Sequence, residues 1–280
     1  MRFLLFLIFR AMASFLAIQA ASAPLAELPF QFREGLLWIS VTVSQSPKPL
    51  NFLIDTGAGV SIINYSTAQQ LGLRLGQRVK VRGVGTTTEG YWPQQLTATV
   101  GQVSLPKEYL VVDLCKLSQA CNCTIDGLLG ADFFRGKNVQ LDFRQQKLRF
   151  LKTSDIPAGA EVLTLRQRGR AFQVPVQVNG GKAEWFRVDT GCASSLQWAS
   201  TREPVKASSL QITVGLSQQT IPTTATTVKL GSHQFCSVPT GLHQARIFRG
   251  ESGLVGLGIL ARFARITLDG KTHRFFLESR

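Results

Sequence analysis

The feature that most constrains the fold of this chain is an internal repeat. The segment Phe52–Ala58 recurs as Phe186–Cys192, with Asp-Thr-Gly at the same place in both copies. Further along, Asp126–Gly130 recurs as Ser252–Gly256. Each copy then closes with two short strand-like segments, which are 139–143 and 147–151 in the first and 265–269 and 274–277 in the second. Three matches in the same order predict a duplicated structural unit.

Alternating apolar and polar residues predict strands at equivalent places in the two copies. Leu37–Val43 and Ala171–Val178 alternate with period two and are rich in Val and Ile. Asn179–Gly181 is a hairpin signal, and the best short helix is Ser66–Leu73. We therefore expect an all-β chain with two lobes related by a pseudo-twofold axis and a cleft between them. The expected boundaries are 28–152 for the N-terminal lobe, 153–159 for the linker and 160–280 for the C-terminal lobe.

Each copy places an aspartate, Asp55 or Asp189, after an apolar strand and at a turn. The glycine of the tripeptide permits backbone conformations that other residues resist. A buried carboxylate is unfavourable without a partner, which the second copy of the turn can supply. Two carboxylates at hydrogen-bonding distance share a proton, so one acts as acid, the other as base, and a water between them becomes the nucleophile. The alternative is a pair of capped turns without chemistry.

These motifs resemble the pepsin and retropepsin clan of aspartic peptidases, particularly bacterial proteins with two retropepsin-like lobes in one chain. The resemblance runs from about Leu36 to Leu277 and rests on both Asp-Thr-Gly motifs and both later apolar-apolar-Gly motifs. It implies that the later strand packs behind each aspartate turn. It also implies a reciprocal threonine clasp and backbone N–H donation by glycines to the carboxylates. The supporting residues would be Thr56, Gly57, Thr190 and Gly191.

The resemblance also indicates which residues lie at the substrate cleft. Ala58 and Cys192 follow the two motifs, and Cys stands where Ala or Ser is usual in the clan. Cys192 would shape a pocket or serve as an oxidisable thiol. A Cys nucleophile is a weaker hypothesis, because no histidine has a motif-like relation to it.

The clan covers its cleft with a β-hairpin flap, and residues 81–92 have the composition of a mobile hairpin. In this segment we expect Gly85, Tyr91 and Trp92 to lie at the cleft. The alternative is an ordinary surface hairpin with two core aromatic residues. The matching segment of the second copy, Val214–Pro222, has a glycine but no aromatic residue. A single working flap would make the asymmetry pepsin-like.

Cys115, Cys121 and Cys123 lie close together in the sequence. They are disulfide candidates, with Cys115 bonded to Cys121 or Cys123. The odd total of five cysteines leaves at least one thiol unpaired within the chain. Three sulfurs without a nearby histidine are an incomplete zinc set, so we expect no metal site and no cofactor.

Residues 1–23 combine a basic start, an apolar run and a small-residue exit, which predicts a signal peptide or an N-terminal membrane anchor through residues 3–23. Either interpretation predicts an extracytoplasmic protein, periplasmic or secreted. The chain carries 31 Lys and Arg against 17 Asp and Glu, a net charge of +14. These basic residues are spread over both copies, which favours a solvated basic surface over a nucleic-acid groove.

The sequence therefore predicts an aspartic endopeptidase whose polypeptide substrate lies extended across the cleft. Asp55 and Asp189 would form the catalytic pair, in a site complete within one chain. One alternative is a non-hydrolytic peptide-binding or scaffolding protein that retains the fold, suggested by Arg187 and Cys192 beside the second aspartate. Another is a protein whose basic surface attaches to anionic lipid or polymer, with strongly salt-dependent binding.

Overall fold

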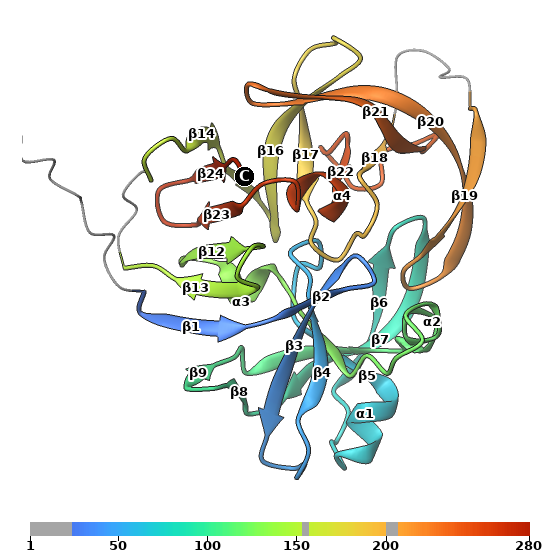
Figure 1. Cartoon of the computed structure of the whole chain (residues 1–280). Coiled ribbons are helices and arrows are strands. Elements are labelled where there is room, and N and C mark those ends of the chain that lie inside the picture. The colour runs from blue at the N-terminus through green and yellow to red at the C-terminus, as the bar shows by residue number, and fades with distance from the viewer. Residues whose placement is uncertain (1–23, 153–156, 200–206) are drawn as a thin grey trace, which may run out of the picture.

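Strands dominate the computed structural model, which describes residues 24–152, 157–199 and 207–280 (Figure 1). The predicted all-β class is confirmed, because the described part contains only four short helices. These are α1 (Tyr65–Gln70), α2 (Cys115–Ala120), α3 (Ala131–Phe134) and α4 (Leu257–Leu260). None of the helices in these ranges has the length and apolar character needed to cross a bilayer. The predicted signal peptide or anchor, and 153–156 of the predicted linker, lie outside the described residues.

The N-terminal half of the chain forms a ten-stranded sheet. Its strands are β2 (Gln31–Arg33), β3 (Leu36–Val43), β4 (Leu50–Ile54), β5 (Ile62–Asn64), β6 (Gln77–Gly83), β7 (Thr86–Gln95), β8 (Ala98–Val100), β9 (Val103–Ser104), β10 (Glu108–Val112) and β11 (Gly127–Leu129). They follow the order β6-β7-β10-β5-β11-β4-β3-β8-β9, with β2 paired to β3. Phe52, Leu53 and Ile54 of β4 are all buried, as expected for a central strand covered on both faces.

The C-terminal half forms an eight-stranded sheet. Its strands are β15 (Arg166–Arg168), β16 (Ala171–Val178), β17 (Glu184–Val188), β18 (Leu196–Trp198), β19 (Ser209–Val214), β20 (Gln218–Leu230), β21 (His233–Leu242) and β22 (Gly253–Val255). They follow the order β15-β16-β17-β22-β18-β21-β20-β19.

A six-stranded sheet joins the two halves. It contains β1 (Ala26–Pro29), β12 (Asn138–Asp142), β13 (Lys147–Phe150), β14 (Glu161–Thr164), β23 (Arg265–Asp269) and β24 (Arg274–Glu278), in the order β1-β13-β12-β23-β24-β14. The closing hairpin of each half meets the other through β12 and β23, where Leu141 lies opposite Ile266. Both of these side chains are buried, so hydrogen bonds and core packing together connect the halves.

The two halves repeat one pairing scheme. Strand β11 runs parallel to β4, with Leu128 opposite Leu53, and β22 runs parallel to β17, with Leu254 opposite Arg187. The hairpins β6–β7 and β19–β20 also correspond. The sequence repeat is thus a repeat of strand pairing, whereas the lobe boundaries that we expect from the sequence stay predictions.

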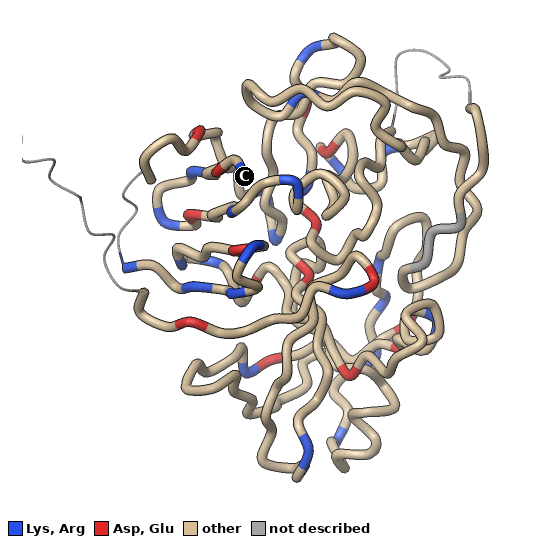
Figure 2. Tube along the Cα trace, viewed as in Figure 1, with Lys and Arg blue, Asp and Glu red and all other residues tan. Residues whose placement is uncertain are grey.

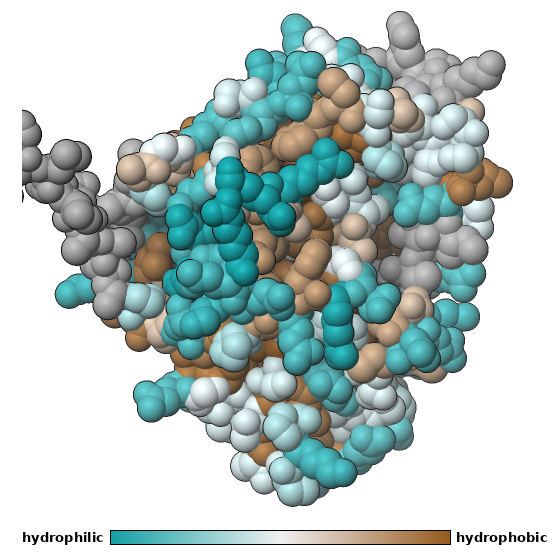
Figure 3. All heavy atoms as spheres, in the orientation of Figure 1, coloured by the Kyte–Doolittle hydropathy of each residue, from teal (hydrophilic) through white to brown (hydrophobic). Residues whose placement is uncertain are grey.

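Charged residues are distributed along the whole described trace rather than gathered in one element (Figure 2). Lys and Arg are visibly more frequent than Asp and Glu, in keeping with the net charge of +14. The face drawn in Figure 3 is mainly hydrophilic, with hydrophobic residues showing between hydrophilic ones. The excess of positive charge is therefore spread along the described trace and does not form a single run.

Candidate active site

Asp55 and Asp189 occupy equivalent turns at the ends of β4 and β17. The later strand of each half supports its turn from behind. The Asp55 amide donates to the Leu129 carbonyl at 2.9 Å, and the Asp189 amide donates to the Val255 carbonyl at 3.0 Å. A buried strand, β4 or β17, thus ends at each carboxylate. The parallel strand beside it, β11 or β22, holds the aspartate in position through this hydrogen bond.

Two buried threonines join the turns through reciprocal hydrogen bonds. The Thr56 amide donates to Thr190 Oγ1 at 3.0 Å, and the Thr190 amide donates to Thr56 Oγ1 at 3.1 Å. The Thr56 hydroxyl donates to the Val188 carbonyl at 2.7 Å, and the Thr190 hydroxyl to the Ile54 carbonyl at 2.8 Å. Because every polar atom in this exchange has a partner, the clasp holds both turns at a fixed distance.

The glycines of the two motifs let the carboxylates approach each other. A methyl group on Gly57 would overlap the carboxyl group of Asp189, and one on Gly191 would overlap that of Asp55. The same glycines donate their amides to their own aspartates, Gly57 to Asp55 at 2.9 Å and Gly191 to Asp189 at 3.0 Å. Each carboxyl group is therefore packed against the other turn, and glycine is required at both positions by this close approach.

The environment pushes the two aspartates toward sharing one proton. Burial raises the pKa of Asp55 and of Asp189, and the charge of Asp55 raises the pKa of Asp189 further. Asp55 accepts backbone hydrogen bonds from both Gly57 and Ala58, which favour its ionised form. Asp189 accepts one, from Gly191. We therefore place the proton on Asp189 and the negative charge on Asp55.

A buried arginine stands beside the pair. Arg187 lies two residues before Asp189 and donates through Nε and Nη2 to both carboxylate oxygens of Glu251, each at 2.8 Å. Its Nη1 donates to the Gly57 carbonyl at 2.7 Å, so it also ties the second half to the first turn. Its guanidinium lies 3.7 Å from the centre of the Phe248 ring. The positive charge lowers the pKa of both aspartates, against the larger effect of burial.

The first turn has a further support from α3. Ser61 donates its amide to Asp132 at 2.9 Å and its hydroxyl to the same carboxylate at 2.8 Å. The Ser61 hydroxyl in turn accepts the Gly130 amide at 3.1 Å. Sequence reasoning missed both Asp132 and the ion pair of Arg187 with Glu251. The available signal was positional, because Asp132 lies two residues after Leu128-Leu129-Gly130 of the repeated motif.

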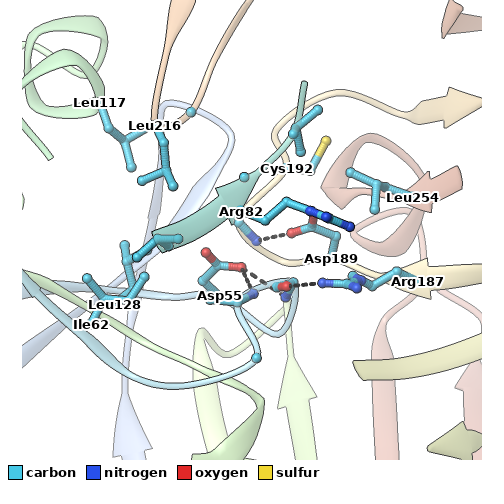
Figure 4. A pocket seen from close by; sticks show the side chains of 18 of the residues that line it. Asp55, Ile62, Arg82, Leu117, Leu128, Arg187, Asp189, Cys192, Leu216 and Leu254 are labelled. Atoms are coloured by element: carbon cyan, nitrogen blue, oxygen red, sulfur yellow. Dashed lines mark hydrogen bonds between the residues drawn. The ribbon is translucent and has the colours of Figure 1, made fainter. Parts of the chain in front are cut away.

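Asp55 and Asp189 lie in a pocket of about 290 Å³ to which both halves contribute. In Figure 4 the two carboxylates lie side by side, with apolar side chains around them. Ile62, Leu117 and Leu128 line it from the first half, and Leu216 and Leu254 from the second. Such a site can hold an extended apolar chain against a polar centre.

Two hairpin tips cover the pocket, one from each half. Val84 lies at the β6–β7 tip, and its carbonyl accepts a hydrogen bond from Gln219 Nε2 of β20 at 3.3 Å. Leu216, in the β19–β20 turn, packs against Gly83, where a methyl group would lie 2.9 Å from its Cδ1. Gly83, Val84 and Leu216 all line the pocket. Both halves therefore contribute a hairpin tip to the pocket, whereas the sequence suggested a contribution from one half only.

Comparison with known proteins agrees with this geometry for the first half. A sequence profile of the family described as aspartyl protease matches residues 39–133. These residues are therefore similar to the aspartyl protease family. The match includes the Asp55 turn, β11 and most of α3, and it ends before the second half of the chain.

One curated protein to which this chain is similar is the retrovirus-related Pol polyprotein from transposon 412 of Drosophila melanogaster. The two sequences are 24% identical over 103 residues, which is 36% of this chain and 8% of that polyprotein. The chain thus spans a small part of the relative that it matches. The likeness supports a retropepsin-like aspartic protease family for the matched region.

The residues that we expected at the cleft do not all line the pocket. Ala58 and Cys192 line the pocket, but Gly85, Tyr91 and Trp92 do not. Gly85 lies at the flap tip against the Gln219 side chain.

The prediction was wrong for the two aromatic residues because they belong to the base of the β6–β7 hairpin. The Tyr91 ring packs on Tyr65 of α1, with centroids 6.0 Å apart. Trp92 faces the Arg170 guanidinium at 5.7 Å. Neither aromatic residue therefore lines the pocket, although Trp92 contacts Arg170 at its edge.

Cys192 lines the pocket as a protonated thiol. Burial and the neighbouring Asp189 raise its pKa to about 12. Its sulfur lies 3.0 Å from the Ser194 hydroxyl. The thiolate is the reactive form of cysteine, so this thiol is unsuited to act as a nucleophile.

The predicted disulfide among Cys115, Cys121 and Cys123 is absent, because all the cysteines in the described residues are free. Cys115 and Cys121 stand at opposite ends of α2, about 9 Å apart along the helix axis, beyond the reach of a disulfide. The Cys123 sulfur instead accepts a hydrogen bond from Arg33 at 3.5 Å. Within the described ranges, no group of three His, Cys, Asp or Glu residues could hold a metal ion.

Proposed function

We propose that this chain is an aspartic endopeptidase that uses Asp55 and Asp189 to activate water. The observation that carries the proposal is the contact between the two turns, in which each carboxyl group packs against the glycine of the other motif. The family match supports it for the turn of Asp55. The pocket around the pair, covered by two hairpin tips, offers an extended site for a polypeptide.

The chemistry follows from the unequal environments of the two carboxyl groups. Asp55, ionised, takes a proton from a water held between the pair, while Asp189 donates its proton to the oxygen of the peptide carbonyl. The hydroxide formed adds to the carbonyl carbon and gives a tetrahedral diol. When the C–N bond breaks, Asp55 returns its proton to the leaving nitrogen, and Asp189 regains one from the diol. The pair ends as it began, with one proton.

The decisive experiment compares Asp55→Asn and Asp189→Asn with the wild-type protein. Each substitution should lower the rate of peptide hydrolysis by at least about 10²–10⁴-fold, because each removes one partner of the proton exchange. Products from a denatured proteome library are mapped by mass spectrometry. Asp113→Asn is the matched control, because Asp113 is exposed and lies outside the pocket lining. Undiminished hydrolysis in either pair variant, or none in the wild type from acid to neutral pH, would contradict the proposal.

A second candidate function is favoured by Arg187. A buried positive charge close to both aspartates opposes their protonation, and a pair that loses its proton could bind peptides without cleaving them. Binding of a non-cleavable peptide isostere, with no turnover of any peptide at any pH, would support this non-hydrolytic role.

A further inference from the structure

Three arginines line the pocket, but only one of them has a carboxylate partner. Arg187 is paired with Glu251 behind the pocket. Arg82 and Arg170 line the pocket and are exposed, and among the described residues neither forms an ion pair. Unpaired guanidinium groups in a binding site are suited to carboxylates, which they bind through two parallel hydrogen bonds.

Arg82 belongs to the covering hairpin. It lies in β6 next to Gly83, opposite Thr87 of β7. Figure 4 shows its side chain extending across the pocket toward the side where Leu254 lies. The one acidic residue of this hairpin, Glu89, is already paired with Arg78. Arg82 therefore lies where a polypeptide bound in the pocket would pass. No acidic residue of its own hairpin is free to neutralise its charge.

Arg170 belongs to the pocket wall. It lies in the turn between β15 and β16, and a methyl group on Gly59 would be 2.9 Å from its Cβ. Its guanidinium faces the Trp92 ring at 5.7 Å. Arg170 is thus held at the end of the first aspartate turn, where it extends the positive character of the pocket beyond the covering hairpin.

The equivalent turn of the first half contributes no such charge to the pocket. Gly35 approaches Ala193, and a methyl group there would lie 3.1 Å from the alanine Cβ. Arg33 in this turn is engaged elsewhere, with its guanidinium 4.3 Å from the Trp38 ring and in contact with Cys123. No residue of this turn lines the pocket. The two ends of the pocket therefore differ in charge.

The balance of charges in the pocket is positive. The aspartate pair with one shared proton carries a single negative charge, and Glu251 offsets Arg187, so Arg82 and Arg170 leave an excess of one positive charge. Closure over a bound chain removes water, which strengthens the attraction between these arginines and a carboxylate. The net charge of +14 would also draw acidic polypeptides to the molecule.

We propose that the pocket selects polypeptides with Asp or Glu flanking the bond that lies over Asp55 and Asp189, and that Arg82 and Arg170 recognise these carboxylates. The inference of cleavage specificity rests on the proposed endopeptidase function. The selection itself is a property of binding, so it can be measured without hydrolysis.

The test uses pairs of synthetic peptides that share an apolar centre and differ only by Glu or Gln on either side of it. With the wild type, kcat/KM should be about 10-fold higher for the best Glu peptide than for its Gln partner, a ratio typical of one charge-assisted contact. The ratio should fall toward one in Arg82→Gln/Arg170→Gln and shrink at high salt. Arg74→Gln is the matched control, because Arg74 is exposed and lies outside the pocket lining. It should keep the wild-type ratio.

A binding arm separates this inference from the proposed function. The same peptides, labelled with a fluorophore, are titrated with the Asp55→Asn variant, and the ratio of Kd values is compared with that of Asp55→Asn/Arg82→Gln/Arg170→Gln. A preference for Glu that disappears with the two arginines supports selection even if no peptide is cleaved. Equal Kd values for Glu and Gln peptides, or a preference that survives loss of both arginines, would overturn it even if hydrolysis is established.

Discussion

The two aspartate turns have the same backbone pairing but are held in place by different side chains. In the first, the Asp132 carboxylate accepts both the amide and the hydroxyl of Ser61. In the second, the position of Asp132 is occupied by Gly258, which packs directly against Ser195. Duplication has preserved the strand pairing that delivers each aspartate, whereas the polar support has diverged.

The second difference concerns the strand before each aspartate. Leu53 of β4 and Arg187 of β17 are equivalent, and both are buried. The leucine needs only apolar neighbours, but the arginine needs Glu251 and the Gly57 carbonyl. The first turn is therefore supported by hydrogen bonds within its own half, while the second depends on a buried ion pair whose arginine also contacts the first turn.

The largest effect is expected when Arg187 is replaced with leucine, the equivalent residue of the first half. Arg187→Leu leaves Glu251 buried without a partner, and removal of one member of a buried ion pair destabilises a protein by about 3–5 kcal/mol. Urea unfolding measures the loss. Arg187→Leu/Glu251→Leu removes both charges and should recover most of it. If the single variant is as stable as the wild type, the ion pair does not hold the second turn.

The Arg187→Leu variant should also change the pH dependence of catalysis. The positive charge lowers the pKa of both aspartates, so its loss should move both limbs of the pH profile of kcat/KM to higher pH. An unchanged profile would show that Arg187 has a purely structural role.

Removal of the side chain that supports the first turn should lower stability less than removal of Arg187. Asp132→Ala leaves the Ser61 amide and hydroxyl without their acceptor, and we expect a loss of about 1.5–3 kcal/mol, typical for hydrogen bonds to a charged group. Thermal unfolding measures it. Gly258→Ala is not a neutral control because it would overlap Ser195. Asp113→Ala is not one either, because the Asp113 carboxylate accepts the Cys115 amide, so exposed Lys48→Ala serves instead. A loss no greater than that of the control would mean that the Thr56 and Thr190 clasp alone fixes the turn.

The sequence predicted those parts of the site that depend on the backbone repeat. Strand alternation and the two Asp-Thr-Gly motifs indicated two equivalent turns, and the structure brings Asp55 and Asp189 together. The sequence could not predict the partner of Arg187, because Glu251 lies 64 residues away on a loop. It also misplaced Tyr91, since the sequence shows an aromatic residue in a hairpin but not that its ring meets Tyr65 of α1.

Titration of the pair should also affect stability. Burial and the charge of Asp55 raise the pKa of Asp189 in the folded state, so the folded protein holds a proton that the unfolded chain releases. Stability is therefore lost as pH rises through this raised pKa. Asp189→Asn cannot ionise, so its Tm should exceed that of the wild type at alkaline pH and match it at acid pH. A change of about 1 kcal/mol in the free energy of unfolding corresponds to a change of about 2–4 °C in Tm. A Tm difference independent of pH would contradict this interpretation.

The smallest effect is expected at the residue after each Asp-Thr-Gly motif, which is Ala58 in the first turn and Cys192 in the second. Cys192→Ala makes the second motif equal to the first, and removal of a protonated, partly buried thiol should change kcat/KM by less than about 3-fold. Iodoacetamide at neutral pH should modify the exposed Cys115 and Cys236 well before Cys192, as peptide mapping would show. Preferential labelling of Cys192, or loss of hydrolysis in Cys192→Ala, would instead give this thiol a role in the chemistry, and the two turns would then differ in mechanism as well as in support.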